Sequence, residues 1–206
     1  ATGSGQPGAD NVEVVSLATG AKIASDAYAT PDTTVGDGSV TIALGSKSFT
    51  VNLASGNDSL SALVSAINQA SDNPGVSASI ITDTNGSRLV LQSQVTGGDN
   101  ALTLSSASTA DGSSFINTTS LQTAASAHIR VDGYDVYSDS NIVDSAISGV
   151  SLNLVKAQPG TSVSLTLAPN AQAATSAVQS FVTAYNKVVT TIAQLTAFDP
   201  TGQNNG

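Results

Sequence analysis

The sequence contains no cysteine, methionine or tryptophan. Without cysteine the chain has neither disulfides nor thiolate metal sites, so disulfide-stapled scaffolds and zinc-finger-type domains are excluded. The absence of thiols suits a chain that crosses a membrane unfolded, because it cannot form wrong bridges on the way.

Basic residues are also scarce: six Lys and Arg stand against fifteen Asp and Glu, for a formal net charge of -9 over 206 residues. Nucleic acids and anionic lipid surfaces bind clustered Lys and Arg, and here the basic residues are scattered from Lys22 to Lys187. No apolar run approaches the roughly 20 residues of a membrane span. We therefore expect no nucleic-acid partner and no membrane insertion.

The stretch from Asp58 to Ser93 changes its apolar spacing twice. Its first part predicts a short helix that Asp58 or Ser59 can cap and that Asn73-Pro74-Gly75 ends. The apolar residues at i, i+3, i+4 and i+7 of this helix are Leu60, Leu63, Val64 and Ile67.

A β-hairpin is predicted directly after the helix. The run from Val76 alternates between apolar and polar residues, Asn85-Gly86 is typical of a two-residue turn, and Leu89-Val90-Leu91 returns as the partner strand. We expect the residues that define this helix-and-hairpin unit to be structural: Leu60, Leu63, Ile67, Asn68, Gly75, Val76, Leu89 and Leu91.

Alternation elsewhere predicts a second hairpin, at residues 40–44 and 49–53, which with the first encloses the helix in a small α+β unit. Further strands are predicted at residues 12–17, 101–104, 127–131, 134–137, 150–154 and 163–167. One helical turn is expected from the spacing of Ile142, Val143, Ala146 and Ile147. The fold class is therefore α+β, mostly antiparallel β.

A long helix is predicted at residues 171–197, where apolar residues recur at steps of three and four. A helix with so few charges needs packing partners. We expect those partners to lie outside this chain, and the interaction candidates on the helix are Phe181, Tyr185, Val188, Ile192 and Leu195.

The sequence contains no recognisable catalytic motif. His128 is the one histidine and lies in an alternating strand, where a solvent-facing role outweighs that of a general base. The acidic residues Asp132, Asp135, Asp139 and Asp144 lack the spacing of a calcium loop, which favours turn and capping roles over metal binding. We expect no catalytic residue, no metal, no cofactor and no enzymatic activity.

Several segments carry a family resemblance over nearly the whole chain. Residues 38–42, 60–68, 75–80, 88–93 and 96–97, with the pair Ile67-Asn68, resemble the hook IN repeat of flagellin-type proteins. The sequence around them is similar to the hook-associated protein 2 family of filament caps, in these segments: 12–18, 131–133, 140–141, 147–154 and 181–186.

The resemblance implies two β-rich outer domains, one inserted in the other, followed by the start of a helical leg. It places residues 36–123 in the inserted α+β domain, residues 11–35 and 124–168 in the enclosing β-rich domain, and residues 169–206 in the leg helix and tail. Residues 1–10 are interpreted as a tag or linker.

The resemblance also implies a function and partners. Members of the family form a homo-oligomeric ring at the extracellular tip of the bacterial flagellum, reach it without a cleaved signal peptide, and promote the assembly of flagellin. An export chaperone is a further candidate partner. The alternative is a surface-exposed adhesin module that binds host glycan or mucin, although four Tyr and four Phe leave little surface for stacking on sugars.

Overall fold

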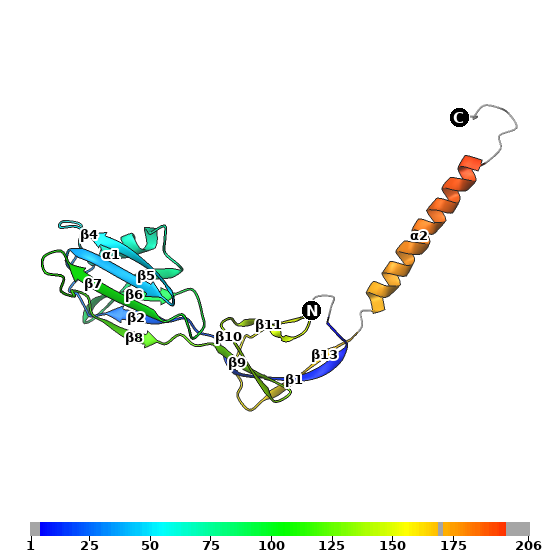
Figure 1. Cartoon of the computed structure of the whole chain (residues 1–206), viewed down its shortest axis with the longest axis horizontal. Coiled ribbons are helices and arrows are strands. Elements are labelled where there is room, and N and C mark those ends of the chain that lie inside the picture. The colour runs from blue at the N-terminus through cyan, green and yellow to red at the C-terminus, as the bar shows by residue number, and fades with distance from the viewer. Residues whose placement is uncertain (1–4, 169–170, 197–206) are drawn as a thin grey trace. The chain divides into compact units, whose positions relative to one another are not determined.

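The computed structural model describes residues 5–168 and 171–196. The chain forms two compact units, Ala1–Leu165 and Thr166–Gly206. The first unit holds two hydrophobic cores, each enclosed by its own pair of β-sheets. The strands β2 to β8 around the larger core lie in sequence between β1 and β9, so this inserted domain interrupts the enclosing domain, which holds the smaller core (Figure 1).

The inserted domain is a sandwich of a four-stranded sheet, ordered β5-β6-β2-β8, and a three-stranded sheet, ordered β4-β3-β7. Its elements are β2 (Lys22–Ser25), β3 (Gly38–Leu44), β4 (Lys47–Leu53), α1 (Leu60–Gln69), β5 (Val76–Asp83), β6 (Gly86–Ser93), β7 (Leu102–Ser108) and β8 (Thr118–Gln122). Both predicted hairpins are present, with β3 pairing β4 and β5 pairing β6 in antiparallel register. Eight strand pairs of the two domains are antiparallel, namely β1–β9, β9–β10, β11–β12, β2–β6, β2–β8, β3–β4, β3–β7 and β5–β6, which confirms the predicted fold class.

Helix α1 is capped by Ser59, the residue before its first turn, whose hydroxyl accepts a hydrogen bond from the Ala62 backbone N–H at 3.1 Å. Its apolar stripe is fully buried against β4 and β5, through Leu60, Leu63 and Ile67. Burial of each such side chain stabilises a fold by about 1.5–3 kcal/mol. The helix therefore supplies a substantial part of the larger core.

The enclosing domain has a four-stranded sheet, ordered β10-β9-β1-β13, and a two-stranded sheet, β11-β12. Its elements are β1 (Gly8–Ser16), β9 (Ala127–Val131), β10 (Tyr134–Ser138), β11 (Ile142–Ile147), β12 (Val150–Asn153) and β13 (Ser162–Leu167). Its core is small, and the buried apolar side chains that form its cluster are Ala18, Ala127, Ile129, Val143 and Leu154. The predicted long helix is α2 (Ala171–Thr196). Neither described helix combines the length and hydropathy needed to cross a membrane.

The helical turn predicted at residues 142–147 is wrong, because these residues form β11. Ile142 and Val143 are β-branched and favour strand geometry, and β12 follows through a turn at Gly149 as a ready cross-strand partner. The pairing of β11 with β12 has an irregularity between Val143 and Ile147. This irregularity breaks the strict alternation of a strand, so the apolar residues of β11 are spaced like those of a helical turn. Residues 8–10, interpreted as part of a tag or linker, belong to β1, which begins at Gly8, and residues 1–4 of that segment lie outside the described residues.

Strand β2 lies elsewhere than the sequence suggests. Residues 22–25 were expected in the enclosing domain, yet β2 pairs with β6 on one side and β8 on the other. Ala21 and Ala124 also belong to the larger core. We therefore propose that the inserted domain spans about residues 21–124, with the first boundary near Ala21 in place of Gly36.

Candidate interaction surface

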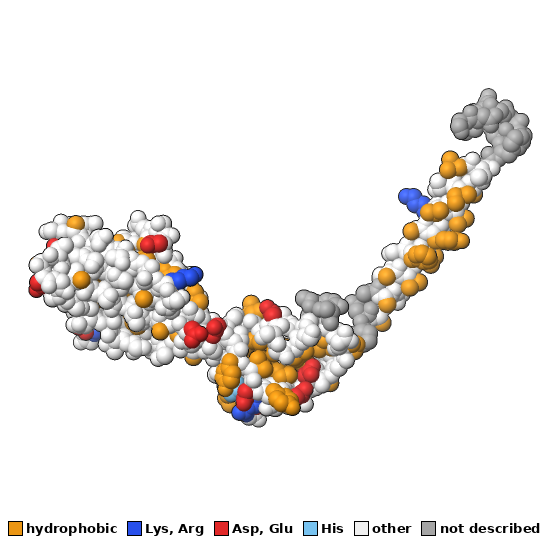
Figure 2. Space-filling view, viewed as in Figure 1, with side chains coloured by type: hydrophobic (Ala, Val, Ile, Leu, Met, Phe, Trp, Pro, Cys, Tyr) orange, Lys and Arg blue, Asp and Glu red, His pale blue; other side chains and the backbone are white. Residues whose placement is uncertain are grey.

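Helix α2 carries one continuous apolar face. Its large side chains recur at alternating steps of three and four, the spacing of a heptad, and are Val178, Phe181, Tyr185, Val188, Ile192 and Leu195. All six are exposed, Phe181 at 70% and Leu195 at 81%. Figure 2 shows hydrophobic side chains following the length of this helix. This heptad face includes every interaction candidate named from the sequence.

Residues beside the heptad face widen it. In heptad notation Val182 and Val189 occupy e positions, and Ala177 and Ala184 occupy g positions. Two-stranded coiled coils place charged residues at e and g, whereas helices of a bundle are apolar over a, d and e. The apolar face of α2 is therefore wide enough to pack against more than one helix.

The polar residues of α2 give it little independent stability. Its threonine hydroxyls donate to the backbone carbonyl four residues earlier, as Thr183 does to Gln179 at 2.8 Å and Thr190 to Asn186 at 2.9 Å. Such bonds satisfy the hydroxyl but do not strengthen a helix. Lys187 is the one charged residue between 171 and 196, so the helix has no ion pairs along its surface. Isolated helices of this kind are marginal in water.

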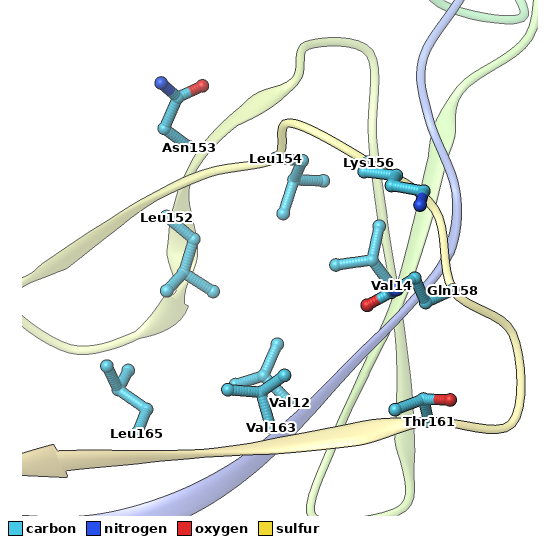
Figure 3. Close-up of a pocket in the computed structure, with 10 residues that line it drawn as sticks. All are labelled: Val12, Val14, Leu152, Asn153, Leu154, Lys156, Gln158, Thr161, Val163 and Leu165. Carbon is cyan, nitrogen blue, oxygen red and sulfur yellow. The ribbon is translucent and has the colours of Figure 1, made fainter.

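A second apolar feature lies in the enclosing domain, where the two sheets do not close completely. A groove of about 220 Å³ opens between β1, β12 and β13 (Figure 3). Apolar side chains from these strands and the residue after β12 line it: Val12, Val14, Leu152, Leu154, Val163 and Leu165. Polar side chains complete the lining, namely Asn153, Lys156, Gln158 and Thr161. The groove adjoins the small core and leaves it partly open.

The outer face of the β10-β9-β1 sheet carries a row of charges. Asp135 Oδ1 lies 2.7 Å from His128 Nε2 and 2.8 Å from Arg130 Nε, and Arg130 Nη1 lies 3.7 Å from Glu13 Oε2. The Tyr137 ring stacks on His128 with centroids 4.6 Å apart. The hydrogen bond from His128, followed by that from Arg130, lowers the pKa of Asp135, and Asp135 in turn raises the pKa of Arg130.

This row is a partly exposed ion-pair ladder, because the side chains of Asp135 and Arg130 are exposed at 48% and 45%, whereas those of His128 and Glu13 are exposed at only 17% and 14%. His128, predicted to face solvent from its strand, lies on that outer face, but Tyr137 stacks on its ring and leaves the His128 side chain only 17% exposed. Among the described residues no group of three or more His, Cys, Asp or Glu side chains is placed to hold a metal ion.

The motif residues of the inserted domain lie together around the end of α1. Asn68 follows the buried Ile67 and pairs with the backbone of Ala78 in β5, donating to its carbonyl at 2.8 Å and accepting from its N–H at 2.9 Å. Asn68 thus attaches the helix to the edge strand. Val76, Leu89 and Leu91 are buried in the larger core, and Gly75 has a φ of 115°, a region that favours glycine.

Asn73, predicted only as part of the segment that ends the helix, connects the end of α1 to the start of β5. Its amide donates to the carbonyls of Ile67 and Val76, and its side-chain oxygen accepts from the backbone N–H groups of Gly75 and Val76. The Asn-Pro-Gly sequence is the signal that could have indicated an Asx turn there.

Two family models match the chain. The model described as flagellar hook-associated protein 2 C-terminus matches residues 124–205, and the model described as flagellin hook IN motif matches residues 39–95. The second match spans α1 and both predicted hairpins, and the first spans β9 to β13 and α2.

Individual proteins agree with these models. The B-type flagellar hook-associated protein 2 of Pseudomonas aeruginosa is 34% identical over 99% of this chain. The crystal structure of FliD (HAP2) from P. aeruginosa PAO1 superposes with a TM-score of 0.83 at 31% identity, covering 97% of this chain and 96% of that one. The flagellar cap protein FliD D1-D2-D3 domains from Escherichia coli give a TM-score of 0.72 at 26% identity, covering 92% and 60% respectively. The chain spans 48% of the length of the P. aeruginosa relative.

Proposed function

Because the chain belongs to the flagellar hook-associated protein 2 family, we propose that it forms the outer domains of a filament cap, a structural component that promotes flagellin assembly at the extracellular tip of the flagellum. The observation that carries the proposal is the match to the P. aeruginosa structure over nearly the whole of both chains. The partners that follow are further copies of the same protein and flagellin.

The exposed face of α2 supports a role as part of a larger assembly. A helix of 26 residues with six large exposed apolar side chains at heptad spacing needs covering. We propose that helices from the remainder of the protein cover this face and form a helical leg together with α2. In the isolated 206-residue chain we then expect weak amide-exchange protection of residues 178–195.

Complementation tests the cap function. The full-length protein would be expressed in cells that lack their cap protein, and filament length and free flagellin in the medium would be measured. We expect the unaltered protein to restore filaments. We expect Phe181→Ser with Tyr185→Ser to abolish them, because two central side chains of the heptad face lose their apolar surface.

A matched control replaces two polar residues on another side of the same helix, Gln179→Ser with Asn186→Ser. This pair should leave filament length unchanged. Full-length protein that is secreted and folded but supports no filament growth would contradict the cap function. Strong exchange protection of residues 178–195 in the isolated monomer would contradict the proposed helix packing.

The relatives reported above are described as flagellar proteins and not as adhesins. Glycan binding therefore gains no support from them and stays a prediction.

A further inference from the structure

Two short connectors join the inserted and enclosing domains, and they pair with each other. The Thr19 backbone N–H donates to the Ala125 carbonyl at 2.8 Å, and the Ala125 N–H donates back to the Thr19 carbonyl at 3.1 Å. One antiparallel bridge of this kind leaves a pair of chains free to bend or twist about it. On their own the connectors would therefore act as a hinge.

Asn141 fixes the enclosing end of the connectors. Its side chain accepts from the Ala18 N–H at 2.8 Å and donates to the Ala18 carbonyl at 2.9 Å. Gly20 is packed at the inserted end, where a Cβ would come within 2.7 Å of the Ser93 carbonyl oxygen. Bending is thus confined to the few residues around Thr19 and Ala125.

A further contact bridges the domains beside the connectors. The loop after β6 belongs to the inserted domain, and its Thr96 hydroxyl donates to the backbone carbonyl of Asp139, in the turn after β10 of the enclosing domain. Ser126 links the same two segments, because its hydroxyl accepts from the Gly98 N–H at 3.0 Å and donates to Asp139 Oδ1 at 2.6 Å.

Gly97 shows how closely the two segments approach. It has a φ of 105°, and a Cβ at this position would overlap the side chain of Asp139. Only glycine fits both the backbone conformation and the space. We propose that Asp139, Ser126 and the segment from Thr96 to Gly98 form a lock that holds the inserted domain in one orientation on the enclosing domain.

The lock can be tested on the 206-residue chain, which contains no cysteine and so accepts spin labels at chosen sites. Asn52→Cys in β4 and Ser151→Cys in β12 place one label on an exposed position of each domain. Double electron–electron resonance then measures the distance between the labels. With the lock intact, the distances between the labels should form one narrow peak. In the Gly97→Ala or Asp139→Ala variant, the distance distribution should become broad.

Two controls isolate the contact itself. Gly112→Ala changes another glycine with positive φ, but no atom lies within 4 Å of its Cβ position. Asp37→Ala removes a carboxylate that accepts from the Thr109 hydroxyl at 2.7 Å inside the inserted domain. Both controls should keep the narrow peak. Amide exchange in β3 and β9 shows whether each domain of a variant remains folded, and Ser126→Ala provides a milder variant that adds no side-chain atoms.

Folded variants at Gly97, Ser126 and Asp139 that all retain the narrow peak would overturn the proposal. A peak that is already broad in the unaltered chain would overturn it as well.

Discussion

The two β-rich domains of the first unit differ in how they complete a core. Among the described residues, the core cluster of the inserted domain holds nineteen buried apolar side chains, whereas that of the enclosing domain holds five. The inserted domain places α1 against its sheets. The enclosing domain has two sheets alone, and the groove beside Val14 and Leu152 leaves their interior partly open. A helix packed on a sandwich thus makes a self-sufficient core, while two small sheets leave apolar surface uncovered.

The largest effect is expected from Leu63→Ala in α1. Leu63 is fully buried, so the change removes apolar contacts and leaves a cavity, which costs about 3 kcal/mol or more of unfolding free energy. Urea denaturation followed by circular dichroism would measure it. Ser65→Ala, on the exposed side of the same helix, should be close to neutral. Equal effects at the two positions would contradict the buried placement of α1.

Ile129→Ala in β9 should cost about 2 kcal/mol, at the lower end of the range for core deletions. Ile129 is buried, but neighbours that line the open groove have room to move toward the vacated space. Amide exchange should show lost protection in β1 and β9 and unchanged protection in β3 and β5. Loss of protection in both domains together would mean that the two cores unfold as one.

Asn68→Ala tests the attachment of α1 to β5. Both backbone groups of Ala78 would lose their partner, and a change of this kind costs about 1–2 kcal/mol. The neighbouring exposed residue provides the control, and Gln69→Ala should have little effect in the same denaturation experiment. If Asn68→Ala left the unfolding free energy unchanged, water would replace Asn68 as the hydrogen-bond partner of the Ala78 backbone at no cost.

The smallest effect is expected from Asp135→Asn on the outer face of the enclosing domain. The folded pKa of Asp135 is lowered, so its stabilisation is present above the usual aspartate pKa of about 3.9 and is lost as the pH falls through the lowered value. The variant should therefore be less stable than the unaltered chain at neutral pH and equal to it in strong acid. Thermal unfolding at a series of pH values measures this, with exposed Asp144→Asn as control. A difference that persists in strong acid would contradict the ion-pair explanation.

The helices and strands that could be predicted from the sequence are those marked by short-range patterns, namely turn residues, alternation or helical spacing. The Asn85-Gly86 turn and the alternation on both sides of it indicated β5 and β6, and the stripe from Leu60 to Ile67 indicated α1. The heptad spacing of α2 was also visible, because exposed helical faces keep their period.

Strands whose apolar and polar residues do not alternate could not be predicted from the sequence. Strand β2 is central in its sheet, and its successive residues Ile23, Ala24 and Ser25 are all buried, so apolar and polar residues do not alternate. Strand β8 is a polar edge strand with almost no apolar pattern. The partners of Asn68 and Asn141 could not be predicted either, because Ala78 and Ala18 reach them only through the tertiary fold.

The paired connectors at Thr19 and Ala125 have an evolutionary consequence. The chain enters and leaves the inserted domain at adjacent points, since a single β-bridge joins the two crossings. Domain insertions are tolerated where the ends lie close together at a surface. Lengthening or exchange of the stretch between the connectors is therefore compatible with the register of β1 and β9, provided that the segment from Thr96 to Gly98 keeps its fit against Asp139.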